Sequence, residues 1–162
     1  MKRHAHCSPV DMRAHRTMTR DVIIVPPELT LVTAWRVMTR EHIRHLPVVR
    51  AGALVGMLSD RDVLARGTMT KGGKLHLEPH LVVGEAMTPT PIETCEASTD
   101  ITDLVRTMTE KKIDAIPVVK GLRLVGLVTT SDLLSLLLLR DHGEPETLPF
   151  EYRLVEDPRA YA

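Results

Sequence analysis

Two motifs in this chain place a hydroxyl three residues before a carboxylate, directly after an apolar run that contains a glycine. The first reads LVGMLSDRD and ends at Asp62, and the second reads LVGLVTTSD and ends at Asp132. Ser59 and Thr129 are predicted to lie where a strand passes into a helix, with each aspartate in the first helical turn. A helix N-terminus with free N–H groups and a hydroxyl can hold phosphate. A nearby carboxylate can accept hydrogen bonds from the two ribose hydroxyls.

The same four residues can also form ordinary helix caps. In a capping box, a Ser or Thr N-cap accepts a hydrogen bond from the third helical residue, whose acidic side chain answers it. An acidic residue in the first turn also complements the helix dipole. The two interpretations are compatible, because the carboxylate of a cap can still face a cleft.

The motifs belong to two copies of a longer unit. Residues 30–64 align with residues 100–134 without a gap and share about a dozen identities, including PVV and LVG. Upstream, TMTRDVIIV at 17–25 resembles AMTPTPIET at 86–94. The repeat predicts five parts: a polar N-terminal segment, repeat 1, a linker, repeat 2 and a C-terminal tail, at residues 1–16, 17–66, 67–83, 84–140 and 141–162.

Each copy shows the same order of predicted elements. A short β-rich segment (22–25 or 91–94) precedes a helix with one apolar face, which begins near residue 31 or 101. Two strands joined by a tight turn follow, and a second helix begins at Ser59 or Thr129. The order is β-α-β-β-α, an α+β class. Because a unit of this size buries little by itself, the two sheets are expected to pack face to face and share a core.

Composition favours a protein of the reducing cytoplasm. Its 21 basic and 21 acidic residues balance, and aromatic residues make up only 2%, so no nucleic-acid partner is expected. Two cysteines are too few for a disulfide framework. No membrane partner is expected either, because the longest apolar run, LLSLLLL at 133–139, is far shorter than the roughly 20 residues of a membrane span. No catalytic motif is present, which predicts that the chain is not an enzyme.

The repeated IRHLPVV…LVGMLSDRDVL and IDAIPVV…LVGLVTTSDLL resemble the cystathionine-β-synthase (CBS) domain, which occurs in tandem pairs. The resemblance implies one module with pseudo-two-fold symmetry, two of which often associate into a flat disc. It implies a regulatory role in which AMP, ADP, ATP or S-adenosylmethionine binds in clefts between the repeats, with no cofactor required. The output is then expected to pass to an effector protein that the sequence does not name.

The resemblance also implies which residues touch the ligand. Ribose and phosphate contacts are expected from the two hydroxyl–carboxylate motifs, and adenine contacts from four isoleucines: Ile23, Ile43, Ile92 and Ile113. The repeats differ before PVV, where the first has Arg44 and His45 and the second has Asp114 and Ala115. Basic residues at these positions often neutralise phosphate in the family, and Arg61 adds a positive charge where the second repeat has Ser131.

From these differences two unequal sites are expected. Arg44, His45 and Arg61 together are predicted to hold a second phosphate or a polyphosphate through charge-assisted hydrogen bonds. Asp114 is expected to repel phosphate, although it can accept hydrogen bonds from a ribose.

Two other functions remain open. The chain can be a ligand-free docking scaffold in which the motifs are only helix caps. It can also be a metal- or redox-responsive module, with His4, His6, Cys7 and His15 as possible soft-metal ligands and Cys95 as a second thiol. A homodimer is expected in either case, because the leucines of 133–139 exceed what one buried helix face needs.

Overall fold

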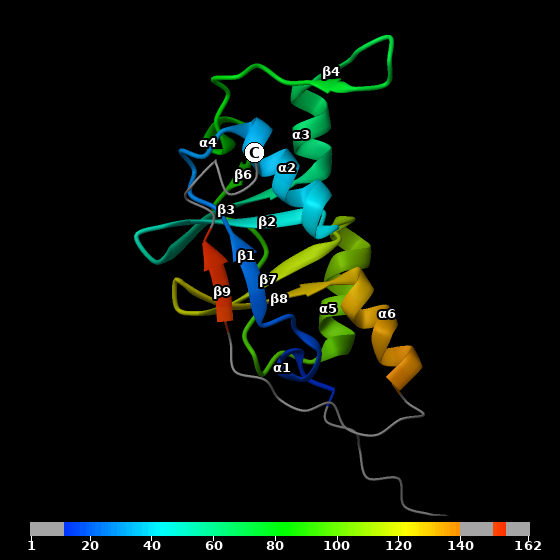
Figure 1. Ribbon diagram of the computed structural model, residues 1–162. Helices are drawn as coiled ribbons and strands as arrows, with labels where there is room; N and C mark the ends of the chain where they lie inside the picture. Colours follow the sequence, from blue (N-terminus) through cyan, green and yellow to red (C-terminus); the bar gives the residue numbers. More distant parts are fainter. Residues whose placement is uncertain (1–11, 140–150, 155–162) are drawn as a thin grey trace, which may run out of the picture.

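The computed structural model describes residues 12–139 and 151–154, which form two similar units whose β-hairpins lie side by side (Figure 1). The first unit contains β1 (Asp21–Ile24), α2 (Leu31–Glu41), β2 (His45–Arg50), β3 (Ala53–Ser59) and α3 (Asp60–Arg66). The second contains α5 (Ile101–Lys111), β7 (Ala115–Lys120), β8 (Arg123–Thr129) and α6 (Thr130–Leu139). The predicted α+β fold of two repeats is confirmed.

The first helix of each unit begins and ends at equivalent residues. Thr30 caps α2 by accepting from Thr33 N, and Asp100 caps α5 by accepting from Thr102 N. Both helices stop where a residue takes the left-handed conformation, His42 in one unit and Lys112 in the other. Their apolar faces are buried, as the helical spacing of the sequence predicts, except that Val105 of α5 is exposed.

The strand predicted at 91–94 is wrong. Pro91 has no amide hydrogen to donate to a strand ladder, and in this unit only Cys95 pairs with the neighbouring strand. Its amide donates to Pro117 O at 3.0 Å, and Val119 N donates back to Cys95 O at 2.8 Å. In the first unit the corresponding residues have their amides and form β1, which pairs in parallel with β9 (Glu151–Leu154).

The repeats exchange the segments that lead into them. The short helix α1 (Ala14–Thr17) precedes the first repeat but bonds to the second, where Ala14 N donates to Thr99 O at 2.8 Å. In the same way α4 (Val83–Ala86) bonds to the first repeat, where Val83 N donates to Leu29 O at 2.8 Å. Residues 12–16, which the sequence suggests are part of a polar terminal segment, therefore cover the second unit.

This exchange explains the glycine of each LVG motif. The short strand β6 (Thr88–Pro89) pairs with β3, and a Cβ at Gly56 would lie 2.6 Å from the carbonyl oxygen of Thr88. At the equivalent position, a Cβ at Gly126 would lie 2.5 Å from Met18 Sδ and 3.3 Å from Thr19 O. Only glycine allows the crossing segment this close to the hairpin strand.

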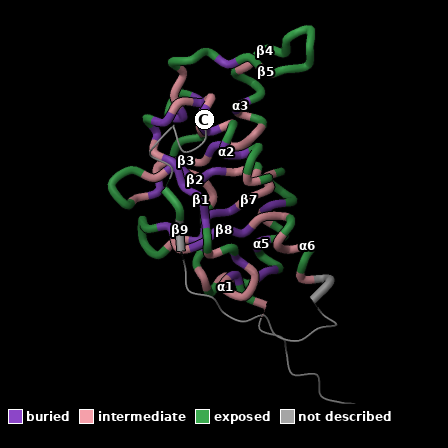
Figure 2. The backbone as a smooth tube through the Cα atoms, in the orientation of Figure 1, coloured by how far each residue is buried: buried purple, intermediate pink, exposed green. Residues whose placement is uncertain are grey.

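A core shared by both repeats lies where the hairpins meet. Its buried residues come from the inner strands of both units: Val22, Ile24, Leu54, Leu124 and Leu127. Leu54 N also donates across the boundary to Leu122 O at 3.0 Å. In Figure 2 the buried colour concentrates on these central strands, whereas the hairpin of β4 (Thr68–Met69) and β5 (Leu75–His76) in the predicted linker is mostly exposed.

We expect Gly56→Ala to lower the free energy of unfolding by about 1–3 kcal/mol, because the new methyl group would force β6 away from β3. The measurement is the urea midpoint of the variant against the wild type. Gly72→Ala is the matched control, since no atom other than Thr70 Oγ1, at 4.0 Å, lies near its Cβ position. Equal urea midpoints for the two variants would contradict the close approach of Thr88 O to Gly56.

Candidate functional site

Two of the cavities between the repeats contain the residues that the sequence singled out, and each of the two is lined by both repeats. The first, which we call the Ser59 cavity, measures about 380 Å³. Its wall includes the first hydroxyl–carboxylate motif and four residues of the second repeat that the sequence singled out: Ser59, Arg61 and Asp62, with Ile92, Ile113, Asp114 and Ala115. The sequence could not show which residues face the Ser59–Asp62 motif. The structure places this motif opposite Ile92 and Ile113 of the second repeat.

The second, which we call the Thr129 cavity, measures about 280 Å³ and repeats this arrangement with the units interchanged. Thr129 and Ser131 face residues of the first repeat: Ile23, Ile43, Arg44 and His45. Asp132 is not among its lining residues, although it is bonded to Thr129. His45 lies in the wall of both cavities, so the two are neighbours.

Both motifs form the capping arrangement. Asp62 Oδ2 accepts from Ser59 Oγ at 2.6 Å and from Ser59 N at 2.8 Å, and Asp62 N donates back to Ser59 Oγ at 3.3 Å. Asp132 Oδ2 accepts in the same way from Thr129 Oγ1 and Thr129 N, both at 2.7 Å. The bonds fix each carboxylate at the strand–helix junction beside its cavity.

The second oxygen of each carboxylate differs between the repeats. Asp132 Oδ1 accepts from Thr19 Oγ1 at 3.2 Å. Within residues 12–139 and 151–154, no group donates a hydrogen bond to Asp62 Oδ1. The Ser59 cavity therefore offers a carboxylate oxygen that can accept from a ligand hydroxyl without breaking the cap.

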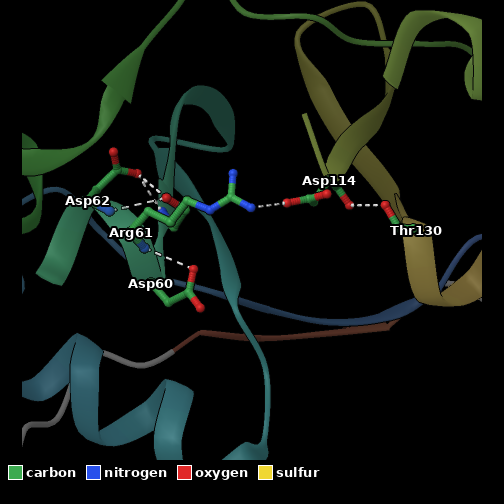
Figure 3. A network of polar contacts seen from close by, with 6 residues as sticks. Asp60, Arg61, Asp62, Asp114 and Thr130 are labelled. Carbon is green, nitrogen blue, oxygen red and sulfur yellow. Dashed lines mark hydrogen bonds and ion pairs between the residues drawn. The ribbon is translucent and has the colours of Figure 1, made fainter. Parts of the chain in front are cut away.

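The cationic cluster predicted from the sequence is divided between the cavities. Arg61 lines only the Ser59 cavity, where its guanidinium crosses from the first repeat to Asp114 Oδ2 of the second at 2.9 Å (Figure 3). Arg44 lines only the Thr129 cavity. Arg44 lies just before β2 and Arg61 lies in the first turn of α3, and their side chains line different cavities, so the structure does not bring the two together in one cavity.

His45 is the titratable group between the two cavities. Burial lowers the pKa of His45 below its usual value, since desolvation disfavours the imidazolium. Asp60 raises it in part, Arg44 lowers it further, and Asp114 and Arg61 make smaller contributions in opposite directions. Burial thus favours the neutral imidazole of His45 over the imidazolium.

Sequence reasoning missed several residues in the cavity walls. Thr19 and Thr88 lie at equivalent places in the two walls, and the repeated Met-Thr pair was the signal that could have found them. Arg153 of β9 also lines the Thr129 cavity, 3.5 Å from both Asp21 Oδ1 and Glu41 Oε2. No sequence signal points to Arg153, because it lies outside the repeats.

The metal and redox candidates have little support in the described part of the chain. His4, His6 and Cys7 fall outside it, and within it no group of three or more His, Cys, Asp or Glu residues is placed to hold a metal ion. Burial raises the pKa of the Cys95 thiol to about 11, so the reactive thiolate is scarce near neutral pH. None of the helices described is both long and apolar enough to cross a membrane.

Comparison with known proteins gives one family. The CBS domain matches residues 12–67 and 83–139. The CBS domain-containing protein YhcV of Bacillus subtilis is 33% identical over 117 residues, which cover 72% of this chain and 79% of YhcV. Hypoxic response protein 1 of Mycobacterium tuberculosis is 30% identical over 121 residues, which cover 74% of this chain and 81% of that protein.

Two solved structures show the same fold. A crystal structure of hypoxic response protein 1 with two coordinated zinc ions has a TM-score of 0.62 at 30% identity, covering 76% of this chain and 97% of that one. CBSX2 in complex with AMP has a TM-score of 0.69 at 24% identity, covering 80% of this chain and 99% of that one.

We expect the stability of the protein to fall as the pH drops below about 6.5, in part because of His45. Its pKa is lower in the folded than in the unfolded protein, so the unfolded chain takes up the proton first. The loss begins at the unfolded-state pKa and is complete below the folded-state pKa. His45→Ala should flatten the plot of unfolding free energy against pH, whereas the exposed His76 offers a control, His76→Ala, that should not. If the slope of unfolding free energy against pH were the same in His45→Ala as in the wild type, the lowered pKa of His45 would be contradicted.

Proposed function

The chain belongs to the CBS-domain family, and on that premise we propose that it is a regulatory module that senses an adenosine-containing ligand in the cavities between its repeats. One observation carries the proposal. Each cavity combines the capped N-terminus of a helix from one repeat with two isoleucines from the other. An adenosine ligand needs both an apolar slot and a polar end.

The Ser59 cavity shows how the parts of such a ligand would be held. Ile92 and Ile113 provide apolar surface for the adenine ring. The ribose hydroxyls would donate to Asp62 Oδ1, which the cap leaves available. The 5′ substituent would then point toward Arg61 and Asp114 at the opposite wall. The complex of CBSX2 with AMP supports the capacity of this fold for an adenosine ligand.

The signal would arise because one ligand touches both repeats. Ligand binding favours the relative arrangement of the repeats that closes both walls on it. The equilibrium shifts only by the difference in affinity between that arrangement and the others. We infer a regulatory rather than catalytic role, in which an effector protein reads the arrangement.

A homodimer is part of the proposal. On the outer helices, Val105 of α5 is 44% exposed and Leu134 of α6 is 58% exposed. A second module that covered these side chains would remove them from water. The side chains of Leu137, Leu138 and Leu139, which the sequence also suggests for this contact, lie outside the described residues.

A metal-responsive function is the second candidate. It is favoured by the zinc ions coordinated in hypoxic response protein 1. In this chain its proposed ligands are His4, His6 and Cys7, so zinc belongs in the same binding screen as the nucleotides.

We expect an adenosine ligand to raise the melting temperature of the wild type and to lose this effect in Asp62→Ala or Asp132→Ala. The screen would use AMP, ADP, ATP, S-adenosylmethionine, NAD and zinc. A ligand at 100 times its dissociation constant should add about 2.7 kcal/mol of stability.

Asp100→Ala is the matched control, because Asp100 caps α5 but neither lines a cavity, as Asp62 does, nor bonds to a cavity residue, as Asp132 bonds to Thr129. It should lose about 1 kcal/mol of stability, as the other two variants do, and keep the ligand response. An equal rise in melting temperature with ligand in all three variants would rule out ligand binding by the two hydroxyl–carboxylate motifs. A response to zinc alone would favour the metal-responsive candidate, and no response to any compound would favour the docking scaffold.

A further inference from the structure

Arg44 and Asp114 occupy the same place in the two repeats but carry opposite charges. Each directly precedes the first hairpin strand of its unit. The backbone contact is the same in both, because Arg44 O accepts from Asp60 N at 2.9 Å and Asp114 O accepts from Thr130 N at 3.0 Å. The pseudo-symmetry of the fold therefore allows the two cavities to be compared at one position, which carries a positive charge in the Thr129 cavity and a negative charge in the Ser59 cavity.

In the Ser59 cavity, one of the two cations that could meet a phosphate is already paired across the cavity. Arg61 reaches across the cavity to Asp114, whose side chain is only 31% exposed (Figure 3). A ligand with several negative charges would have to take Arg61 away and leave Asp114 unpaired beside it. Burying an unpaired charge next to a like charge is unfavourable.

The other charges around this cavity do not offset that cost. Its wall contains three carboxylates, Asp62, Glu93 and Asp114, against two cations, Arg61 and Lys112. Glu93 also forms an ion pair with Lys111 of α5. The balance of the wall is therefore unfavourable for a polyphosphate and favourable for a ligand group that is neutral or positive.

In the Thr129 cavity, Arg44 is a cation that is not paired across the cavity. Arg44 stands where the other cavity has an acid, and Ser131 replaces the arginine of the motif, so the cross-cavity ion pair cannot form. Of the carboxylates in this wall, Asp21 and Glu41 each lie 3.5 Å from Arg153. Among the described residues no acidic side chain forms an ion pair with Arg44.

We infer that the two cavities sort adenosine ligands by the charge of the 5′ substituent. The Thr129 cavity takes the phosphorylated ligand, and the Ser59 cavity takes one whose 5′ substituent is an uncharged thioether or a cationic sulfonium. The inference rests on the proposed function and adds a specificity to it. His45 does not contribute to the difference, since it lines both cavities.

Calorimetric titration with ATP and with 5′-methylthioadenosine tests this sorting. The two probes share adenosine and differ in the charge at the 5′ end. The wild type should bind each at one site: Asp132→Ala should weaken ATP binding, and Asp62→Ala should weaken 5′-methylthioadenosine binding. Added salt should weaken only the ATP site, because screening acts on the charged contact.

Two substitutions that each remove one charge test the charges themselves. Arg44→Gln should weaken ATP binding about tenfold, which is about 1.4 kcal/mol, and leave 5′-methylthioadenosine unchanged. Asp114→Asn should release Arg61 and create a second ATP site. Melting temperatures of both variants serve as the folding control.

The outcomes separate this inference from the proposed function. Binding of both probes with no difference between the cavities, or ATP affinities that neither charge variant changes, overturns the sorting and leaves the adenosine sensor in place. ATP bound at the Ser59 cavity of the wild type also overturns it. Failure of every adenosine ligand to bind overturns both.

Discussion

The structure depends on the contact between the two hairpins. A unit of this size buries little surface by itself, and Leu54, Leu124 and Leu127 close the shared core because β3 and β8 face one another. Burying one such leucine stabilises the fold by about 1.5–3 kcal/mol. The cavities are a by-product of the same contact, because their walls come from both units. A change in how the hairpins meet would therefore alter both sites together.

The exchange of leading segments strengthens this contact. Met18 and Thr19 cross the hairpin of the second repeat, and Met87 and Thr88 cross that of the first. The residues that cross at Gly56 and Gly126 also bring Thr88 and Thr19 into the cavity walls. Gly56 and Gly126 leave the space that the crossing backbones need, and they thus help to position part of the candidate site. Stability and the geometry of the candidate site therefore depend on the same few contacts.

Much of the fold could be predicted from the sequence because the constraints recur. A glycine is needed twice for the same crossing, and a hydroxyl with a carboxylate three residues later is needed twice for the same cap. The pairing of half-sites could not be predicted, since it depends on which sides of the two hairpins meet. The absence of a strand at 91–94 was predictable in principle from Pro91, but the repeat suggested that the second copy would follow the first. Arg153 reaches its cavity through pairing of β9 with β1, and that long-range register has no local signal.

The positions that differ between the repeats are as informative as those that agree. The cap residues are equivalent in both copies, with Ser59 and Asp62 matching Thr129 and Asp132, because a helix begins at the same point in each. The cap does not constrain the charged positions. It forms equally well with Arg61 in the first repeat and with Ser131 in the second. The same backbone therefore supports two different electrostatic environments at no cost to the fold. Where the fold leaves a residue unconstrained and the residue still lines a cavity, its identity is the part of the sequence that the proposed ligand would explain.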